Sequence, residues 1–229
     1  MTVPGRCRRA QRSAVLVVAL SLAACGSTPV RPATAPPPSP TSAVLVPART
    51  TDPVTSDPSD APPVGAGPGA GDALTVQPQP APGSCHYTYV ASFPLPDPSC
   101  TPGAIDPRVT QANIDSTICR AGWTEAVRPP ESVTAPEKEA SALAYGYTGS
   151  FATAEYDHLV PLELGGDPND PANLWVEPND RPGATTVYNT KDELEDALNS
   201  LVCSGRLPLA TARKAIATNW VAAMHEYLT

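Results

Sequence analysis

The chain has 229 residues, with 15 Lys and Arg against 23 Asp and Glu, which gives a formal charge of −8. This balance excludes a broadly basic protein that binds nucleic acid through its net charge. The 30 prolines are more than one compact domain normally carries, so part of the chain is expected to lie outside any folded core.

The first 24 residues are typical of an export signal. Four arginines precede an apolar run, Ala14 to Leu22, that is too short to cross a bilayer as a mature helix. The sequence Leu22-Ala-Ala-Cys25 then resembles the lipobox of bacterial lipoproteins, which implies cleavage before Cys25 and a lipid on its sulfur. An ordinary secretory signal with a chance cysteine is the alternative.

Residues 25–82 are predicted to be a disordered tether. Fifteen of the 57 residues from 26 to 82 are proline, Ala, Thr, Ser and Gly make up most of the rest, and none is aromatic. Such a segment cannot bury enough apolar surface to offset the entropy that it loses on ordering. We expect it to hold a domain away from a membrane.

Residues 83–229 are predicted to form one domain, because their number suits a single core. They contain nine Lys and Arg and nineteen Asp and Glu, a formal charge of −10. A domain this acidic must bind nucleic acid through a bound cation and a locally basic groove, or bind it weakly.

Four cysteines belong to this domain, and an even number in an exported domain indicates two disulfides. Three pairings are possible. The favoured pairs are Cys85–Cys100, which closes a short proline-rich loop, and Cys119–Cys203, which joins an early helix to a late one. Zinc binding is the alternative, but no Cys-x-x-Cys and no Cys/His cluster supports it.

The patterns of the domain predict several helices and a small sheet. In chain order we expect a strand over 87–93, a helix over 109–119, a helix from Thr134 to a C-cap at Gly146, strands over 153–159 and 174–177, a helix over 186–202 and a helix from Pro208 to Tyr227. A capping-box pattern at Thr190 offers a later start for the helix over 186–202. Its apolar side is expected to carry Val187, Leu194, Leu198, Leu201 and Val202.

The segment from Glu155 to Glu177 contains the residues that favour chemistry. Asp157 can bind a divalent cation through oxygen, and a neutral His158 can take a proton from water near pH 7. Adjacent side chains on a strand point to opposite faces, so both can serve one centre only where the strand ends or bends. Pro161 and the glycine pair that follows it supply such a break.

This segment resembles the HNH motif, the core of the His-Me finger (ββα-metal) nucleases. The resemblance rests on Asp157-His158-Leu-Val-Pro161-Leu162, on Gly165-Gly166 and on Asn173-Leu174, with fourteen residues between His158 and Asn173. Asn189 is the best match to the third position of the motif. The resemblance implies an α+β fold, a mostly helical domain with a small two-stranded ββα-metal core, preceded by the disordered proline-rich linker.

The resemblance also implies a mechanism. His158 would deprotonate a water molecule that attacks a phosphodiester, and Asn173 would brace the loop that holds His158. Asp157 and Asn189 would coordinate one divalent cation, with Mg²⁺ expected first and Mn²⁺ or another ion as the alternative.

Several residues keep alternative interpretations. Arg128 and Arg181 are candidates for binding phosphate oxygens on charge type, but they also fit ordinary surface arginines. Asn189 could simply begin its helix. Glu155 lies two residues before Asp157 and is a reserve ligand.

These observations predict a monomeric, exported HNH-like endonuclease that hydrolyses phosphodiester bonds of nucleic acid with a divalent cation. Lipid on Cys25 would anchor it to the outer face of the cell membrane. The alternative is a non-catalytic cell-envelope lipoprotein that keeps a degenerate HNH scaffold for binding or structure, with His158 as a structural histidine.

Overall fold

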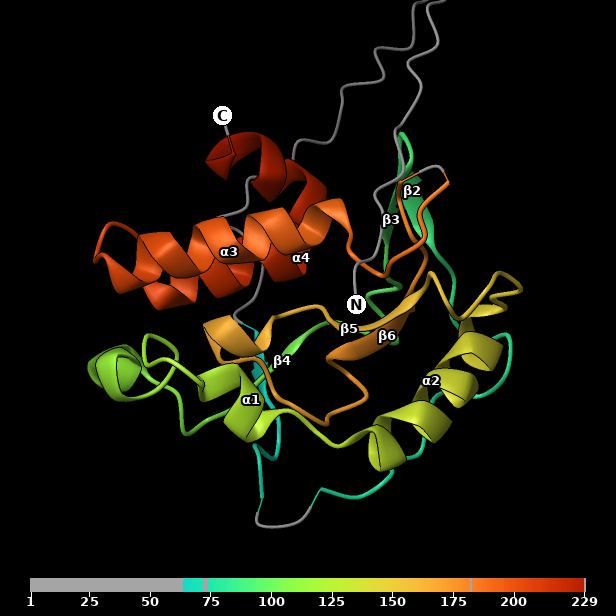
Figure 1. The fold of residues 1–229 in the computed structure, drawn as a ribbon, viewed down its shortest axis with the longest axis horizontal. Helices are drawn as coiled ribbons and strands as arrows, with labels where there is room; N and C mark the ends of the chain where they lie inside the picture. The colour runs from blue at the N-terminus through green and yellow to red at the C-terminus, as the bar shows by residue number, and fades with distance from the viewer. Residues whose placement is uncertain (1–63, 72–73, 182, 229) are drawn as a thin grey trace, which may run out of the picture. The chain divides into compact units, whose positions relative to one another are not determined.

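A computed structural model describes residues 64–71, 74–181 and 183–228, which form a mixed α+β domain (Figure 1). The predicted signal peptide, Cys25 and the tether as far as residue 63 lie outside the described residues. Within the described ranges, no helix combines the length and the apolar character needed to cross a membrane.

The strands of the described residues form three two-stranded sheets. β1 (Gly65–Ala66) pairs in parallel with β4 (Ala104–Ile105), and β2 (Thr88–Val90) pairs antiparallel with β3 (Phe93–Leu95). β5 (Glu155–His158) and β6 (Leu174–Glu177) form an antiparallel hairpin, close to the two strands that the sequence predicts there.

Helices surround this hairpin. They are α1 (Trp123–Val127), α2 (Glu131–Tyr145), α3 (Thr190–Cys203) and α4 (Leu209–Tyr227), with short 3-10 helices η2 (Gln111–Ser116) and η3 (Leu162–Leu164). In Figure 1, α3 and α4 lie side by side and α2 packs along β6. The hairpin therefore lies between the α3–α4 pair and α2.

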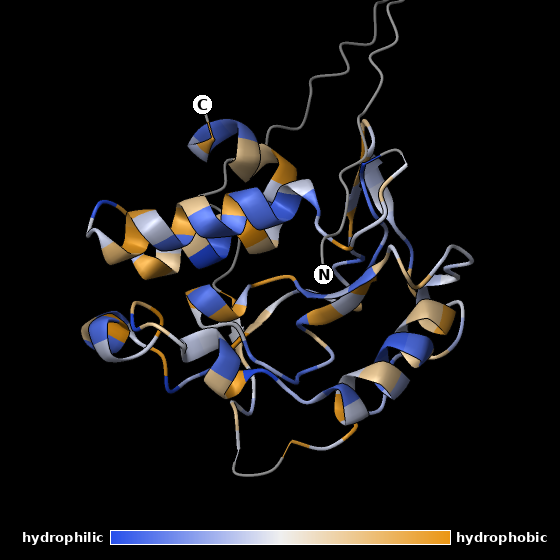
Figure 2. Ribbon diagram, viewed as in Figure 1, coloured by the Kyte–Doolittle hydropathy of each residue, from blue (hydrophilic) through white to orange (hydrophobic). Residues whose placement is uncertain are grey.

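The α3–α4 pair forms because apolar residues recur every four positions, which places them on one face of each helix. Figure 2 shows both helices banded in hydrophobic and hydrophilic stretches. The residues on the buried faces are Leu194, Leu198 and Val202 of α3 and Ala212, Ile216 and Trp220 of α4. A second apolar cluster packs α2 against the hairpin through Tyr145, Trp175 and Val176.

Both predicted disulfides are confirmed. Cys85 is bonded to Cys100, and Cys119 is bonded to Cys203 at the end of α3. The second bond joins residues 84 positions apart, so it greatly restricts the unfolded chain.

The first half of the domain differs from the predicted elements. The helix expected over 109–119 is only the 3-10 helix η2, because the Asn113 side chain accepts the Thr110 N–H and donates to the Arg108 carbonyl, which competes with helical bonding. The strand expected over 87–93 is a hairpin that reverses at Ala91, where φ is 55°.

The start of α2 differs from the predicted one, and the start of α3 decides between two predicted positions. α2 begins at Glu131 rather than Thr134 and tolerates Pro136 early in the helix. α3 begins at Thr190, the later of the two predicted starts, and Val187 is 42% exposed instead of facing the core.

Part of the predicted tether packs against the domain. We call residues 64–71 and 74–82 the strap. Gly67 N–H donates to the Ile105 carbonyl (2.9 Å), and Gly69 N–H donates to Asp167 Oδ2 (2.6 Å). Hydrogen bonds of its backbone, rather than large apolar side chains, hold the strap against the domain. Its composition therefore resembles that of a disordered segment.

We expect Gly67→Ala to destabilise the domain, because an added Cβ would lie 2.4 Å from Asp167 Oδ2 and 2.9 Å from Asp170 Oδ2. Overpacking of this kind costs about 1–3 kcal/mol, so the melting temperature should fall by several degrees. Gly71→Ala is the matched control, since no atom lies within 4 Å of the corresponding Cβ. Equal melting temperatures for the two variants would contradict the packing of the strap.

Candidate functional site

The β5–β6 hairpin sets the directions of the candidate residues. Glu155 lies opposite Glu177 and Asp157 lies opposite Trp175, so these four side chains share one face of the hairpin. His158 is the last residue of β5 and belongs to the other face. The strand thus ends at the position where the sequence predicts a break.

His158 has a defined tautomer. It is 6% exposed, and its Nε2 lies 3.0 Å from the Pro168 carbonyl oxygen. A carbonyl only accepts hydrogen bonds, so Nε2 must carry the proton. Nδ1 then holds the lone pair and makes no hydrogen bond to any residue in the described part of the chain. It is the nitrogen that can accept a proton from water.

Burial lowers the pKa of His158 to about 4, and the positive charges of Arg128 and Lys191 act in the same direction. The Pro168 carbonyl and the Asp157 carboxylate oppose this shift without cancelling it. His158 is therefore neutral at physiological pH, which is the form that a general base requires.

Asn173 braces the loop that joins His158 to β6. Its Oδ1 accepts the N–H groups of Val160 (2.9 Å) and Ala104 (3.3 Å), and its Nδ2 donates to the carbonyls of Val160 (3.0 Å) and Asp167 (2.9 Å). The same loop needs glycine at position 166, where a Cβ would lie 1.7 Å from the Val160 carbonyl oxygen. These four hydrogen bonds hold the loop in place, and a part for Asn173 in catalysis stays a prediction.

The strap holds this loop from the outside, on both sides of the residue that His158 contacts. Asp167 accepts the Gly69 N–H, and Asn169 Nδ2 donates to the Thr75 carbonyl (2.7 Å). Pro168, whose carbonyl fixes the His158 ring, lies between these two anchored residues.

Asp157 contacts a buried lysine. Lys191, in the first turn of α3, is 0% exposed, and its Nζ lies 2.8 Å from Asp157 Oδ2 and 2.9 Å from the His158 carbonyl oxygen. The same Nζ also donates to Glu195 one turn further along α3. Trp175 Nε1 donates to Asp157 Oδ2 as well, at 3.2 Å.

The carboxyls around Lys191 are tuned by burial and mutual repulsion. Burial and the Asp157 charge hold the pKa of Glu177 well above its usual range, which favours the protonated form that can donate to Asp157. Burial also raises the pKa of Glu155 to about 8, with the charges of Asp157 and Asp192 adding to the effect. Burial opposes the charge on Lys191, but the surrounding carboxylates outweigh it and hold its pKa well above the usual value.

Asn189 lies at the N-terminus of α3. Its Oδ1 accepts the Asp180 N–H at 3.2 Å, and Asn189 and Asp192 form a reciprocal capping box. Asn189 is therefore the N-cap residue of α3, in agreement with the interpretation that it begins the helix.

The two candidate arginines have different surroundings. Arg128 is exposed, its side chain makes no hydrogen bond or ion pair within the described residues, and its positive charge lowers the pKa of His158, Glu155 and Glu163. Arg181 instead pairs with Glu193 at 2.5 Å and lies over the ring of Tyr188. Of the two arginines, Arg128 is thus the one whose charge influences His158.

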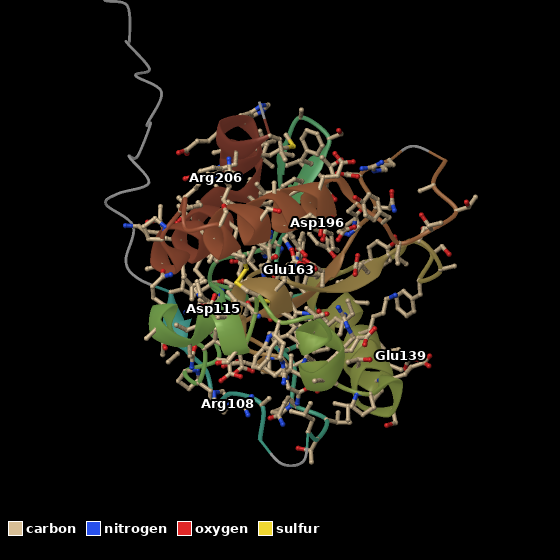
Figure 3. All side chains as sticks on the ribbon, turned by 60° about the vertical axis from the view of Figure 1, so that its left-hand side comes forward. Arg108, Asp115, Glu139, Glu163, Asp196 and Arg206 are labelled. Atoms are coloured by element: carbon tan, nitrogen blue, oxygen red, sulfur yellow. A yellow bond between two sulfur atoms is a disulfide. The ribbon has the colours of Figure 1, made fainter. Side chains whose placement is uncertain are left out.

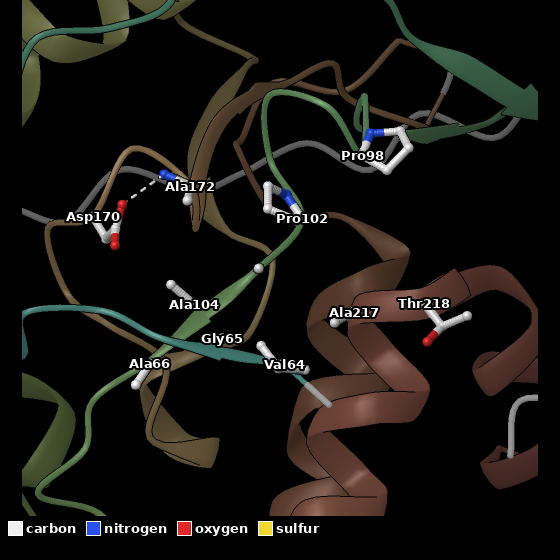
Figure 4. A pocket seen from close by; sticks show the side chains of 11 residues that line it. Val64, Gly65, Ala66, Pro98, Pro102, Ala104, Asp170, Ala172, Ala217 and Thr218 are labelled. Carbon is white, nitrogen blue, oxygen red and sulfur yellow. Dashed lines mark hydrogen bonds between the residues drawn. The ribbon is translucent and has the colours of Figure 1, made fainter. Parts of the chain in front are cut away.

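An acidic pocket of about 350 Å³ opens beside this cluster. Its acidic lining consists of Glu155, Glu163, Asp192, Glu195 and Asp196. Glu163 on η3 and Asp196 on α3 lie near each other in Figure 3, and burial with the Asp196 charge raises the pKa of Glu163 to about 7. A larger pocket of about 600 Å³ lies elsewhere, between the β1–β4 pair and α4 (Figure 4), and is lined mainly by small apolar residues and proline.

A divalent cation does not fit the two predicted ligands in this arrangement. The Lys191 ammonium and the Trp175 indole already donate to Asp157 Oδ2, and Asn189 Oδ1 caps α3. Within the ranges that the structure describes, no group of three or more His, Cys, Asp or Glu side chains is arranged to hold a metal ion.

Sequence reasoning missed Lys191 and Glu177. The signal for Lys191 was its spacing, since it lies three residues before Leu194 and seven before Leu198, on the apolar face of α3. The signal for Glu177 was its position two residues after Trp175 on a strand opposite Asp157 and Glu155.

No family model, no curated protein and no solved structure matches this chain.

We expect Asn173→Ala to destabilise the domain strongly, because it leaves four buried backbone groups without their partner. Each such group costs about 1–3 kcal/mol when it is left unsatisfied. Asn173→Asp keeps the two accepting contacts and loses the two donating ones, so its loss in urea unfolding should be intermediate. If Asn173→Ala unfolds at the wild-type urea concentration, the bracing role is wrong.

The titration of His158 offers a test by NMR. Its imidazole is expected to stay neutral, with the proton on Nε2, until the pH falls to about 4. A histidine in the unfolded chain has a pKa of about 6.5, so folding disfavours the protonated imidazole. The free energy of unfolding should therefore fall as the pH drops from that value through about 4. His158→Gln assigns the signal and removes this part of the pH dependence. A midpoint near 6.5 in the folded protein would contradict the buried environment.

Proposed function

We propose that residues 83–229, with the strap, act as an endonuclease that hydrolyses phosphodiester bonds of nucleic acid with His158 as general base. The observation that carries this proposal is the fixed His158 tautomer. Its Nε2–H is held by the Pro168 carbonyl, and the lone pair on Nδ1 is left to receive a proton. The HNH-like sequence around Asp157 and His158 supplies the reaction class.

In the proposed mechanism, His158 Nδ1 takes a proton from a water molecule as the water attacks the phosphorus atom. Arg128 would bind the non-bridging phosphate oxygens. It is exposed, its side chain makes no ion pair in the described part of the chain, and its positive charge lowers the pKa of His158. Asn173 holds the loop that orients the imidazole.

The charge of the domain limits how substrate can approach. Five carboxyls line the pocket beside the site, and phosphate is repelled by those that are ionised. The positive charge of Arg128 lowers the pKa of Glu155 and of Glu163, so Arg128 offsets this repulsion locally. The predicted dependence on Mg²⁺ or Mn²⁺ stays a prediction, and no step is assigned to an ion held by Asp157 and Asn189.

We also propose that the protein is exported and anchored by lipid on Cys25 to the outer face of the cell membrane. The two disulfides support this location, because such bonds form and persist in oxidising compartments. The tether would then hold the nuclease at a distance from the lipid surface.

The direct test is cleavage of plasmid DNA and of RNA by residues 26–229 with disulfides intact, in Mg²⁺, Mn²⁺ or EDTA. His158→Ala should lower the rate by about 10²–10⁴-fold, the usual contribution of a general base. Arg128→Ala should lower kcat/KM and weaken its dependence on salt, because it removes a phosphate contact. Arg181→Ala is the matched control, since Arg181 is paired with Glu193.

The second candidate function is a non-catalytic binding scaffold in the cell envelope. The burial of His158, at 6% exposure, and the acidic surroundings favour it. Absence of cleavage by a correctly folded protein under every metal condition would overturn the nuclease proposal and leave this one.

A further inference from the structure

We propose that the ammonium of Lys191 is the resident cation of this centre and takes the place beside Asp157 that the resemblance gives to a divalent metal ion. The inference deepens the proposed function, on which its meaning for catalysis rests. The contacts that carry it, and the test below, do not depend on activity.

The contacts of the ammonium are complete. Lysine Nζ has three N–H donors, and here it has three oxygen partners: Asp157 Oδ2 at 2.8 Å, the His158 carbonyl at 2.9 Å and Glu195 Oε1. A carboxylate, a second carboxylate and a backbone carbonyl are also the kinds of ligand that hard divalent cations use. Lys191 therefore occupies a site built of cation ligands.

Acidic side chains surround the ammonium. Asp157 Oδ2 and Glu195 Oε1 both contact the ammonium, and Glu177 lies on the same face of the hairpin as Asp157. Glu177 is 1% exposed, and its Oε1 makes no hydrogen bond to the described residues. Among the described residues no other cation pairs with Asp157 or Glu195, so without Lys191 these two acids would lack a positive partner.

The position of Lys191 is otherwise unfavourable. It is the second residue of α3, where the helix dipole disfavours positive charge, and a fully buried lysine is rare. Helix preference and hydrophobicity therefore do not explain a lysine there. The acidic ligands do, because a buried charge is tolerated when it is paired and hydrogen-bonded.

The ammonium also links the two halves of the site. It joins α3 to the Asp157 side chain and to the backbone carbonyl of His158 itself. Replacing it with a divalent ion would require Lys191 to leave this position, since the two cations would repel each other at such a distance. A fixed ammonium thus sets the charge of the centre and the location of the His158 backbone.

The test compares residues 26–229 as wild type, Lys191→Met, Asp157→Asn and the double variant, by thermal unfolding in EDTA, Mg²⁺, Mn²⁺ or Ca²⁺ and by calorimetric titration with Mn²⁺. The wild type should show the same melting temperature in every condition and no Mn²⁺ binding that depends on Asp157. Lys191→Met should melt well below wild type, and the double variant should recover part of the loss, because it removes both buried charges.

Lys191→Ala supplies a second readout, because it removes the ammonium and opens space between the acids. It should gain stabilisation by Mn²⁺ or Ca²⁺ that Asp157→Asn/Lys191→Ala lacks. The inference is overturned if wild type binds Mn²⁺ stoichiometrically and Asp157→Asn abolishes that binding, or if Lys191→Met melts with wild type. If Lys191→Met does not fold, the calorimetric titration of the wild type with Mn²⁺ still tests whether a metal ion binds at Asp157. Since none of these readouts is catalytic, an inactive protein can satisfy the inference and an active one can contradict it.

Discussion

The ion pair between Lys191 and Asp157 is the interaction on which the centre depends. Both groups are buried, so each carries a desolvation cost that is offset only by good geometry and further hydrogen bonds. The structure supplies both, through the His158 carbonyl and Glu195 on the lysine side and the Trp175 indole on the aspartate side. Removing one partner of such a pair costs about 3–5 kcal/mol, and here it would also release β5 from α3.

A second constraint acts on the loop between β5 and β6. Several of its buried backbone groups lie outside regular ladders and bond to side chains instead. Asn173 satisfies four of them, and Asp167 accepts the N–H groups of Asn169 and Asp170 (each 2.9 Å). These contacts hold Pro168, whose carbonyl fixes the His158 ring. The geometry of one imidazole thus rests on residues that do not themselves touch a substrate.

Much of this could be predicted from the sequence, and the failures have physical causes. Periodicity predicted α3 and α4, and the break after His158 was visible in Pro161 and the glycine pair. The strap escaped prediction because its backbone, not its side chains, makes the contacts. Lys191 was missed because a charged residue is normally assigned to the exposed face, although its spacing to Leu194 places it on the buried one. Asn189 shows a different limit, since the same amide suits a metal ligand and a helix cap.

The central claim, that a lysine ammonium rather than a metal ion accompanies Asp157, is tested most directly by a crystal structure of the chain soaked in Mn²⁺ and measured at a wavelength that reveals manganese. The account predicts no manganese signal within bonding distance of Asp157, with Lys191 Nζ in contact with Asp157 Oδ2 and the His158 carbonyl oxygen. A manganese ion coordinated by Asp157, with Lys191 displaced toward solvent, would contradict it.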